Sequence, residues 1–284
     1  MSPADPPRAS QSFVEKAGEA WARLQDRTDS LIDPLGRIAI ERLRLVAGER
    51  VVDVGCGCGQ TLLQLAERVG PSGQVLGVDI SPPMLAVARD RVAGRPTIAL
   101  ALADAQTYAF APAAFDAVYS RFGVMFFDDP RAAFRNLHGA ARSGARLSFV
   151  CWQELAKNPW ATRPLEAVMR LLPESAMPDM LREGRPGPFF LSDPARVRAI
   201  LGDAGWKDVS LEPVEMPLHL GRAATLDEAV EYSLQIGPAA RAMADAPETL
   251  KPALEAALRE ALAPFVSARG VFMDGAAFVV GARA

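Results

Sequence analysis

A short apolar segment that ends in three alternating glycines constrains this 284-residue chain more than any other feature. The apolar residues of segment 51–54 favour a buried strand, because β-branched side chains pack well on a pleated sheet. Gly55, Gly57 and Gly59 then let the backbone bend sharply and approach a ligand closely. A helical pattern follows over residues 61–68. A strand, a glycine turn and a helix start in this order predict a nucleotide-binding site at the edge of a parallel sheet.

The spacing of the glycines and of two later acids narrows the kind of nucleotide. A dinucleotide-binding turn needs its third glycine at position 60, where this chain has Gln60. Asp79 ends the next predicted strand, 24 positions after Gly55, at about the interval expected for an acid that binds ribose hydroxyls. Asp104 follows another apolar run and is placed to accept a hydrogen bond from an adenine amino group.

Four ordered motifs resemble those of the class I S-adenosylmethionine-dependent methyltransferases. They are VDVGCGCG, GVDIS, ADAQ and FDAVYSRFGVMFFDDP. Within that class the chain is most similar to the broad group that includes the ubiquinone and menaquinone biosynthesis methyltransferases. The resemblance covers residues 49–151 well and residues 192–284 more loosely. One departure is the turn before the fifth strand, commonly Pro-Gly-Gly in the family, which reads Arg-Ser-Gly-Ala at 142–145.

The resemblance implies S-adenosylmethionine as the methyl donor and indicates which residues bind it. These are Asp53, Gly55, Cys56, Gly57, Gln60, Thr61, Asp79, Ile80, Met84, Ala103, Asp104, Ala105, Ser120, Arg121 and Phe122. Asp79 would bind the ribose, Asp104 the adenine amino group, and Ile80 and Met84 the faces of the adenine ring. Residues 120–122 lie where the methionine end of the donor binds in the family.

Several of these residues also have a purely structural interpretation. Asp79 can cap the helix that follows Ser81, and Asp104 can form a turn. Arg121 can form a structural salt bridge as well as bind a carboxylate of donor or acceptor. Asp53 can anchor the amides of the glycine turn, or reach the donor's amino group through a water molecule. The apolar contacts can equally belong to the core.

The acceptor side of the site is less well defined by the sequence. Phe126, Trp152 and Trp160 are the predicted walls of an apolar substrate pocket. His219 is the candidate general base, because it follows the sixth predicted strand at the mouth of that pocket, although a structural role is the stronger interpretation. His138 is expected within a helix, away from the chemistry. No metal site is expected, because too few Cys and His residues accompany the Cys-x-Cys pair of the glycine turn.

The alternation of strand and helix predicts an α/β fold, a Rossmann-like doubly wound sheet of seven strands with six parallel and the seventh antiparallel. The antiparallel orientation of the seventh strand is what the family resemblance implies. Strands are expected over 51–54, 74–79, 97–102, 115–120, 146–151, 209–214 and 277–282. Helices are expected over 13–24, 31–46 with a break near Pro34, 81–92, 131–141 and 195–204, with capped starts before the last three and at Thr225.

The same pattern divides the chain into a core and a lid. Residues 1–12 are expected to be a loose tail, 13–48 N-terminal helices of the lid, 49–151 the cofactor-binding core, 152–191 a lid insertion, 192–220 the core continued, 221–268 a helical lid insertion, and 269–284 a C-terminal strand hairpin of the core. Parallel strands present their carboxyl ends to one edge of the sheet, where ligands bind. Both insertions are therefore expected on the ligand side.

Composition and charge restrict the partners and the compartment. A net charge of −3 gives no basic footprint, so nucleic acid is not an expected partner. No apolar run approaches the roughly 20 residues that a membrane span requires. Three cysteines, an odd number, favour a reduced cytoplasmic protein over a disulfide scaffold. The oligomeric state, monomer or homodimer, stays open.

The sequence therefore predicts S-adenosylmethionine-dependent methyl transfer to a small, apolar or aromatic acceptor held under a helical lid. Two alternatives remain open. One is a catalytically silent module that binds the cofactor and acts as a scaffold or sensor. The other is a nicotinamide-dependent oxidoreductase, which Gln60 and the ADAQ element disfavour.

Overall fold

One twisted sheet organises the chain, and its strands lie in the order β3-β2-β1-β4-β5-β8-β6. The computed structural model describes residues 18–182 and 184–284. The strands are β1 (Arg50–Val54), β2 (Gln74–Asp79), β3 (Ile98–Leu102), β4 (Phe115–Arg121), β5 (Ala141–Trp152), β6 (Lys207–His219), β7 (Val266–Ser267) and β8 (Gly270–Arg283). Strands β1 to β5 pair in parallel, and β8 runs antiparallel to both of its neighbours, β5 and β6. The predicted sheet of six parallel strands and one antiparallel strand is confirmed, with the two-residue β7 added beside β8.

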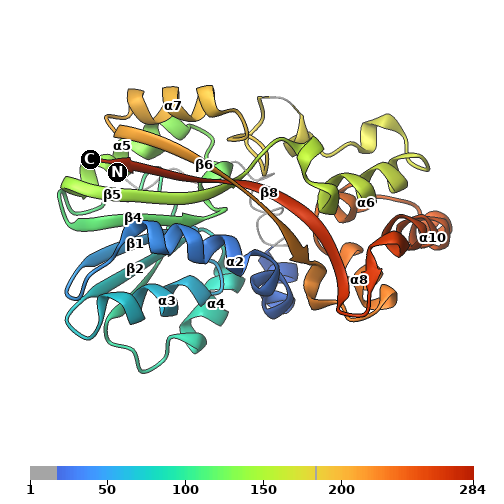
Figure 1. The fold of residues 1–284 in the computed structure, drawn as a ribbon, viewed down its shortest axis with the longest axis horizontal. Coiled ribbons are helices and arrows are strands. Elements are labelled where there is room, and N and C mark those ends of the chain that lie inside the picture. Colours follow the sequence, from blue (N-terminus) through green and yellow to red (C-terminus); the bar gives the residue numbers. More distant parts are fainter. Residues whose placement is uncertain (1–17, 183) are drawn as a thin grey trace.

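Helices cover both faces of this sheet (Figure 1). They are α2 (Gln25–Leu43), α3 (Gln60–Val69), α4 (Pro82–Arg91), α5 (Pro130–Ala140), α6 (Pro159–Met169), α7 (Pro194–Asp203), α8 (Leu226–Ser233), α9 (Pro238–Ala242) and α10 (Lys251–Leu262). From β1 the chain continues to β2, toward one edge of the sheet, whereas from β4 it continues to β5, toward the opposite edge. Right-handed crossovers therefore place α3 and α5 on opposite faces.

The predicted helix starts are largely present. The side chains of Asp129 and Asp193 accept backbone N–H groups of the following turn at 3.0 and 2.8 Å. Thr225 accepts the N–H of Glu228 at 3.3 Å, as expected for an N-cap. Ser81 precedes α4 as predicted, but its side chain makes no capping bond.

The predicted break near Pro34 is wrong, because α2 runs without interruption from Gln25 to Leu43. Leu31, Leu35 and other residues of one face are buried against the sheet. This packing outweighs the local cost of a proline inside a helix. Residues 18–23 are also helical, whereas the tail and the start of the first predicted helix lie outside the described residues.

Strands β6 and β8 are much longer than the sequence indicates. Their pairing runs from Lys207 opposite Arg283 to His219 opposite Phe272, beyond the ends of the other strands. Pro213 and Pro217 interrupt the sequence pattern of β6, but prolines are tolerated on an edge strand. Residues 270–283 are one strand paired with β6, so the predicted C-terminal hairpin is instead a long ribbon closed by a helical segment.

The ribbon leads to a second lobe with its own hydrophobic core (Figure 1). Helices α6, α8, α9 and α10 and the distal end of β8 contribute its buried side chains, among them Val168, Tyr232, Leu258, Leu262 and Val271. Residues 221–268 supply three of these helices, and α6 comes from the segment after β5. The two lobes are therefore joined by β5, β6 and β8.

Asn158 ties the segment after β5 to the ribbon. Its side chain is fully buried, and its Oδ1 accepts the N–H of Ala276 and the indole N–H of Trp160, each at 3.0 Å. Its Nδ2 donates to the carbonyls of Ala276 at 3.2 Å and Glu154 at 3.1 Å. All hydrogen-bonding groups of this amide are thus used within the protein.

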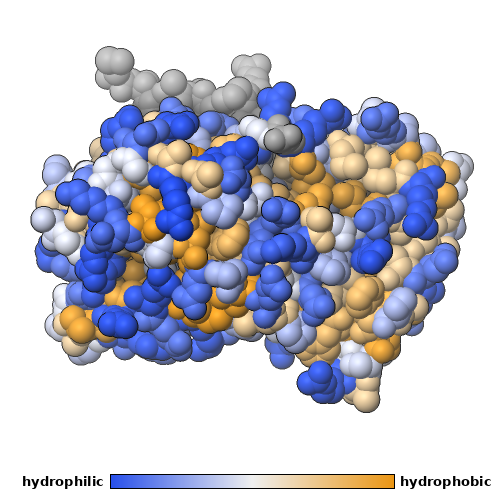
Figure 2. Space-filling view, turned by 45° about the horizontal axis from the view of Figure 1, so that its top comes forward, coloured by the Kyte–Doolittle hydropathy of each residue, from blue (hydrophilic) through white to orange (hydrophobic). Residues whose placement is uncertain are grey.

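No helix in the described ranges is both long and apolar enough to cross a membrane. Figure 2 shows hydrophilic and apolar residues interspersed over the visible face of the molecule.

Replacing Asn158 by Ala should lower the free energy of unfolding by about 2 to 4 kcal/mol, because buried groups left without partners cost about 1 to 3 kcal/mol each. Urea unfolding followed by circular dichroism measures this loss. Glu166→Ala, at an exposed position of α6, is the control and should stay within about 0.5 kcal/mol of wild type. A decrease in the free energy of unfolding below about 1 kcal/mol for Asn158→Ala would contradict the proposed role of Asn158 in joining this segment to the ribbon.

Candidate functional site: the cofactor cavity

The glycine turn connects β1 to α3 in a conformation that favours glycine at three positions. Gly55, Gly57 and Gly59 have φ angles of 70°, 55° and 82°, and Gly59 is the residue before the first turn of α3. Left-handed φ values of this kind are costly for residues with a Cβ. The sequence prediction of a turn that requires glycine agrees with this geometry.

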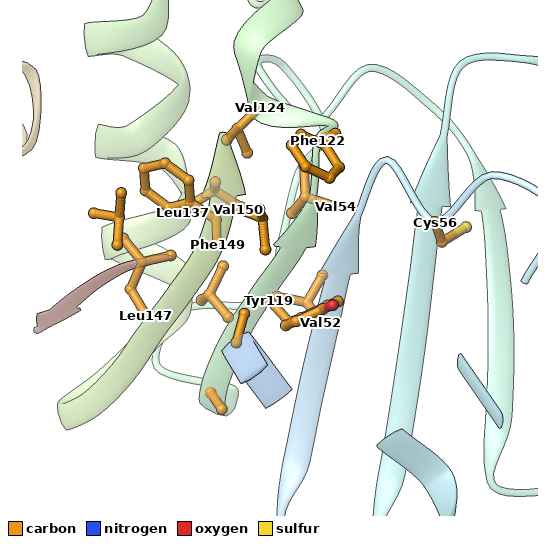
Figure 3. Close-up of a cluster of buried hydrophobic side chains, with 14 of the residues drawn as sticks. Val52, Val54, Cys56, Tyr119, Phe122, Val124, Leu137, Leu147, Phe149 and Val150 are labelled. Atoms are coloured by element: carbon orange, nitrogen blue, oxygen red, sulfur yellow. The ribbon is translucent and has the colours of Figure 1, made fainter. Parts of the chain in front are cut away.

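A second glycine brings the loop after β4 against this turn. A Cβ on Gly55 would lie 2.8 Å from the Cα of Gly123, and a Cβ on Gly123 would lie 2.6 Å from the carbonyl oxygen of Val54. Ser120 donates its hydroxyl to the same carbonyl at 2.7 Å. Phe122 has a φ of 59°, rare for a residue with a side chain, and lies beside Val54 at the end of β4 (Figure 3).

Asp79 holds the glycine turn and the start of α4 together. Its carboxylate accepts the N–H of Gly57 at 2.8 Å and the N–H of Ser81 at 2.9 Å. Burial raises its pKa above the usual range of an aspartate, against the effect of these hydrogen bonds. The structural role considered for Asp79 is therefore present, and its contact with a ribose stays a prediction.

Apolar side chains lie exposed next to Asp79. Ile80 is 51% exposed and Leu102, at the end of the neighbouring strand β3, is 52% exposed. Met84 also reaches the turn, since a Cβ on Gly57 would lie 2.9 Å from its terminal methyl group. Exposed apolar side chains beside a carboxylate suit a flat ring joined to a polar sugar.

The ADAQ element forms a turn directly after β3. Asp104 accepts the backbone N–H of Gln106 at 2.8 Å and its side-chain amide at 2.9 Å. Ala103 donates its N–H to the carbonyl of Asp79 at 3.0 Å, and Ala105 is buried. Ala103 therefore lies beside the end of β2, while a bond from Asp104 to adenine stays a prediction.

Asp53 is a fully buried carboxyl group inside β1. Its Oδ2 accepts the hydroxyl of Thr61, and its Oδ1 has no hydrogen-bond partner among the described residues. Burial raises the pKa of Asp53 to about 7. The unpartnered oxygen leaves one hydrogen-bonding position free for a ligand or a water molecule.

Arg121 forms the structural salt bridge that the sequence allowed, with a partner, Asp29, that the sequence did not identify. It donates to Oδ1 of Asp29 at 2.7 Å and to the side-chain oxygen of Gln60. Arg91 of α4 donates to the other oxygen of Asp29 at 2.8 Å. The side chains of Arg121 and Asp29 are only 8% and 13% exposed. Asp29 thus links α2 to both β4 and α4.

Asp29 and its neighbours enclose a small cavity above the glycine turn, with a volume of about 50 Å³. Its walls are Trp21, Gln25, Thr28, Asp29, Ile32, Gly55, Cys56, Gly57, Cys58, Thr61, Met84 and Arg121. The predicted residues Gly55, Cys56, Gly57, Thr61, Met84 and Arg121 are thus brought together. The first five wall residues, from the segment 21–32, were not predicted individually, since the sequence placed these helices only in a lid.

Cys56 and Cys58 are buried beside this cavity. A Cβ on Gly77 of β2 would lie 2.8 Å from the sulfur of Cys56, so this thiol packs against the strand. In the described part of the chain no group of three or more His, Cys, Asp or Glu residues could hold a metal ion. A contact of Cys56 with the cofactor stays a prediction.

Aromatic rings form a row from β4 to the second lobe. Phe122 stacks on Trp152 with ring centres 4.2 Å apart, and Trp152 lies 4.8 Å from Trp160. Trp152 is 4% exposed and is the last residue of β5, so it supports the row from within the core. Phe126, in the 3-10 turn after β4, is 46% exposed.

The structure does not bring His219 to the walls of the cavity. Its ring stacks on Phe272 at 4.5 Å, and its Nε2 lies 3.1 Å from the carbonyl oxygen of Ala223. This placement at the distal end of β6 fits the structural interpretation, and a catalytic role stays a prediction. His138 lies against Trp206 between α5 and the residues that follow α7, away from the glycine turn.

Comparisons with known proteins place the chain in a family. A family model for a methyltransferase domain matches residues 51–144. Aklanonic acid methyltransferase DauC of Streptomyces sp. (strain C5) is 35% identical over 182 residues, which cover 60% of this chain and 83% of that relative. The chain therefore belongs to the S-adenosylmethionine-dependent methyltransferases, and S-adenosylmethionine is its cofactor.

Two further matches agree with this family and with the fold. The ubiquinone/menaquinone biosynthesis C-methyltransferase UbiE of Cellvibrio japonicus is 36% identical over 114 residues, covering 39% of this chain and 46% of that relative. The structure of phosphoethanolamine N-methyltransferase 2 of Haemonchus contortus, in complex with S-adenosylhomocysteine and phosphomonomethylethanolamine, superposes with a TM-score of 0.54. It is 22% identical and the match covers 88% of this chain and 52% of that one, which shows the shared fold.

The buried carboxyl group of Asp53 should make the stability of the protein depend on pH. The folded chain keeps this proton up to about pH 7, whereas the unfolded chain releases it near pH 3.8. Between these values the folded state binds one more proton, so the free energy of unfolding falls by about 1.4 kcal/mol per pH unit as pH rises. Asp53→Asn removes this dependence.

From pH 5 to pH 8, Asp53→Asn should therefore gain about 2 to 3 kcal/mol relative to wild type in urea unfolding without ligand. Asp227→Asn, at an exposed position of α8, serves as the control for the loss of one carboxyl group. Parallel pH profiles for wild type and Asp53→Asn would show that Asp53 does not hold its proton in the folded chain.

Proposed function

We propose that this methyltransferase transfers the methyl group of S-adenosylmethionine to a small, apolar or aromatic acceptor bound between the two lobes. The observation that supports the acceptor class most directly is Phe126, a large apolar side chain left 46% exposed after β4. It follows Arg121 and Phe122, at the carboxyl edge of the parallel strands where ligands of such sheets bind.

The residues around the cavity fit the donor in chemical type. Asp79, Ile80 and Leu102 offer a carboxylate and apolar surface for the ribose and the adenine ring. The free oxygen of Asp53 and the guanidinium of Arg121 lie beside the glycine turn and suit the charged amino-acid end. On this proposal Asp79 and Asp104 bind the ribose and the adenine amino group.

The protein's own contribution to this reaction is positioning. The bound donor supplies an activated methyl group on a sulfonium. Holding an acceptor in line with that methyl group can account for roughly 7 to 11 kcal/mol of the barrier. The second lobe and the aromatic row exclude water from the reacting atoms, which favours the spreading of positive charge. If the acceptor loses a proton, His219 would need to move to the site.

The sequence left two alternative functions open. The methyltransferase matches do not favour a nicotinamide-dependent oxidoreductase. A silent scaffold would bind S-adenosylhomocysteine but would form none of it from S-adenosylmethionine with any acceptor. The cytoplasmic location also stays a proposal, supported by three free cysteines and no disulfide among the described residues.

Asp79→Ala should weaken the binding of S-adenosylhomocysteine by about 1.5 to 3 kcal/mol, roughly 10- to 150-fold, through the loss of bonds to a charged group. Isothermal titration calorimetry measures the affinity. Asp90→Ala, an exposed position on α4, should bind as wild type does. Wild-type protein that binds no S-adenosylhomocysteine at high micromolar concentration would refute the proposed function.

Phe126→Ala should raise the KM for an aromatic acceptor about tenfold or more and leave the KM for S-adenosylmethionine unchanged, because burying such a ring is worth about 1.5 to 3 kcal/mol. The acceptor is chosen from phenols, quinols and anthraquinone acids by formation of S-adenosylhomocysteine. Val46→Ala is the control, since Val46 is also an exposed apolar residue, at 58%, but precedes β1 at the opposite edge of the sheet. An unchanged KM for the acceptor would show that Phe126 does not contact the acceptor.

A further inference from the structure

We infer that Asp29 occupies the place of the donor's methionine carboxylate at Arg121, so that the start of α2 must move aside when S-adenosylmethionine binds. This inference rests on the proposed arrangement of the donor. The carboxylate of Asp29 and the carboxylate of the donor would then compete for the same guanidinium, that of Arg121.

The strand order fixes which end of the donor reaches Arg121. Ile80 and Leu102 mark the apolar surface at the ends of β2 and β3, while Arg121 ends β4. Strands β3, β2, β1 and β4 are consecutive neighbours, and three spacings of about 4.8 Å separate the outer two by roughly 14 Å. A donor whose adenine lies on Ile80 therefore extends across the glycine turn toward β4. Its charged amino-acid end reaches the side of Arg121.

Arg121 is the basic residue among the cavity walls, and Asp29 already neutralises it. The two side chains are joined at 2.7 Å and are both largely buried, so solvent screens this pair only weakly. Asp29 presents the same functional group, a carboxylate, as the amino-acid end of the donor. It therefore satisfies Arg121 in the absence of a ligand.

The cavity is too small for the donor while Asp29 and its neighbours stay in place. Its volume of about 50 Å³ holds a few water molecules, whereas pockets for ligands of this size measure about 300 to 1,000 Å³. Residues 21–32 form the wall that faces the glycine turn. Because that turn is fixed by β1, β4 and Asp79, the start of α2 is the wall that must yield.

The anchoring of α2 shows where it can move and where it cannot. Gly36 lets the helix lie directly on Arg121, since a Cβ there would be 2.6 Å from Cδ of that side chain. The carbonyl of Gly36 also accepts the hydroxyl of Tyr119 at 3.0 Å. Asp29 lies two turns before Gly36 on the same face. Gly36 is thus a fixed contact. The preceding turns are held by Asp29 through Arg91 and Arg121, and by Arg27, which donates to the carbonyls of Gly221 at 2.8 Å and Glu228 at 2.6 Å.

Such competition lowers the apparent affinity for the donor by the fraction of molecules in which Asp29 has left Arg121. Asp29→Asn keeps the shape of the side chain but removes its charge. We expect this variant to bind S-adenosylhomocysteine at least about threefold more tightly than wild type, measured by isothermal titration calorimetry. Asp29→Glu retains the charge and should show no such gain.

Asp33→Asn is the matched control on the same helix. Asp33 bonds to Arg37 and Gln64, each at 2.6 Å, and not to Arg121. It loses the same charge and should leave the affinity within about 1.5-fold of wild type, because the Arg121 contact is intact. If Asp29→Asn does not fold, Asp29→Ser tests the same loss of charge.

Weaker binding by the neutral variant would overturn the inference and make Asp29 a ligand of the donor, for example of its amino group. Unchanged binding would overturn it by showing that Asp29 and the donor do not compete. If wild type itself binds no S-adenosylhomocysteine, the proposed function fails. That outcome is recognised without reference to the Asp29 variants.

Discussion

The backbone contact between Gly55 and Gly123 is the constraint on which the cavity above the glycine turn depends. It brings the loop after β4 within van der Waals distance of the turn after β1, and neither position has room for a Cβ. The contact places Arg121 and the strained Phe122 beside the glycine turn, and Asp79 fixes the other side of that turn. Both walls beneath this cavity are therefore tightly packed, so we expect adjustment to a ligand in the segment above them.

The second lobe depends on the first through the long β6–β8 ribbon and the amide of Asn158. The ribbon carries residues 221–268 outward, and Asn158 joins the segment after β5 to β8. The row from Phe122 through Trp152 to Trp160 crosses the same junction. We therefore expect a change in the position of the second lobe to shift the residues at the end of β4, where the acceptor is proposed to bind.

Much of the fold and of the local geometry of the proposed donor site could be predicted because the signals are local. The glycine turn, the acid at the end of β2 and the ADAQ turn depend on backbone geometry within a few residues. The continuous α2 and the length of β6 could not be predicted, because burial against the sheet and an edge position override the prolines at 34, 213 and 217. Asp29 gave no signal at all, since its partner Arg121 lies 92 positions away.

The prolines of β6 have a consequence for how the molecule behaves among copies of itself. Pro213 and Pro217 lie four residues apart, so their nitrogen atoms face the same side of the strand. The ladder with β8 continues through both positions, which leaves the missing N–H groups on the outer, unpaired edge of the sheet. A second strand approaching that edge finds two donors absent. The longest exposed edge of this sheet is thereby protected against strand addition and aggregation.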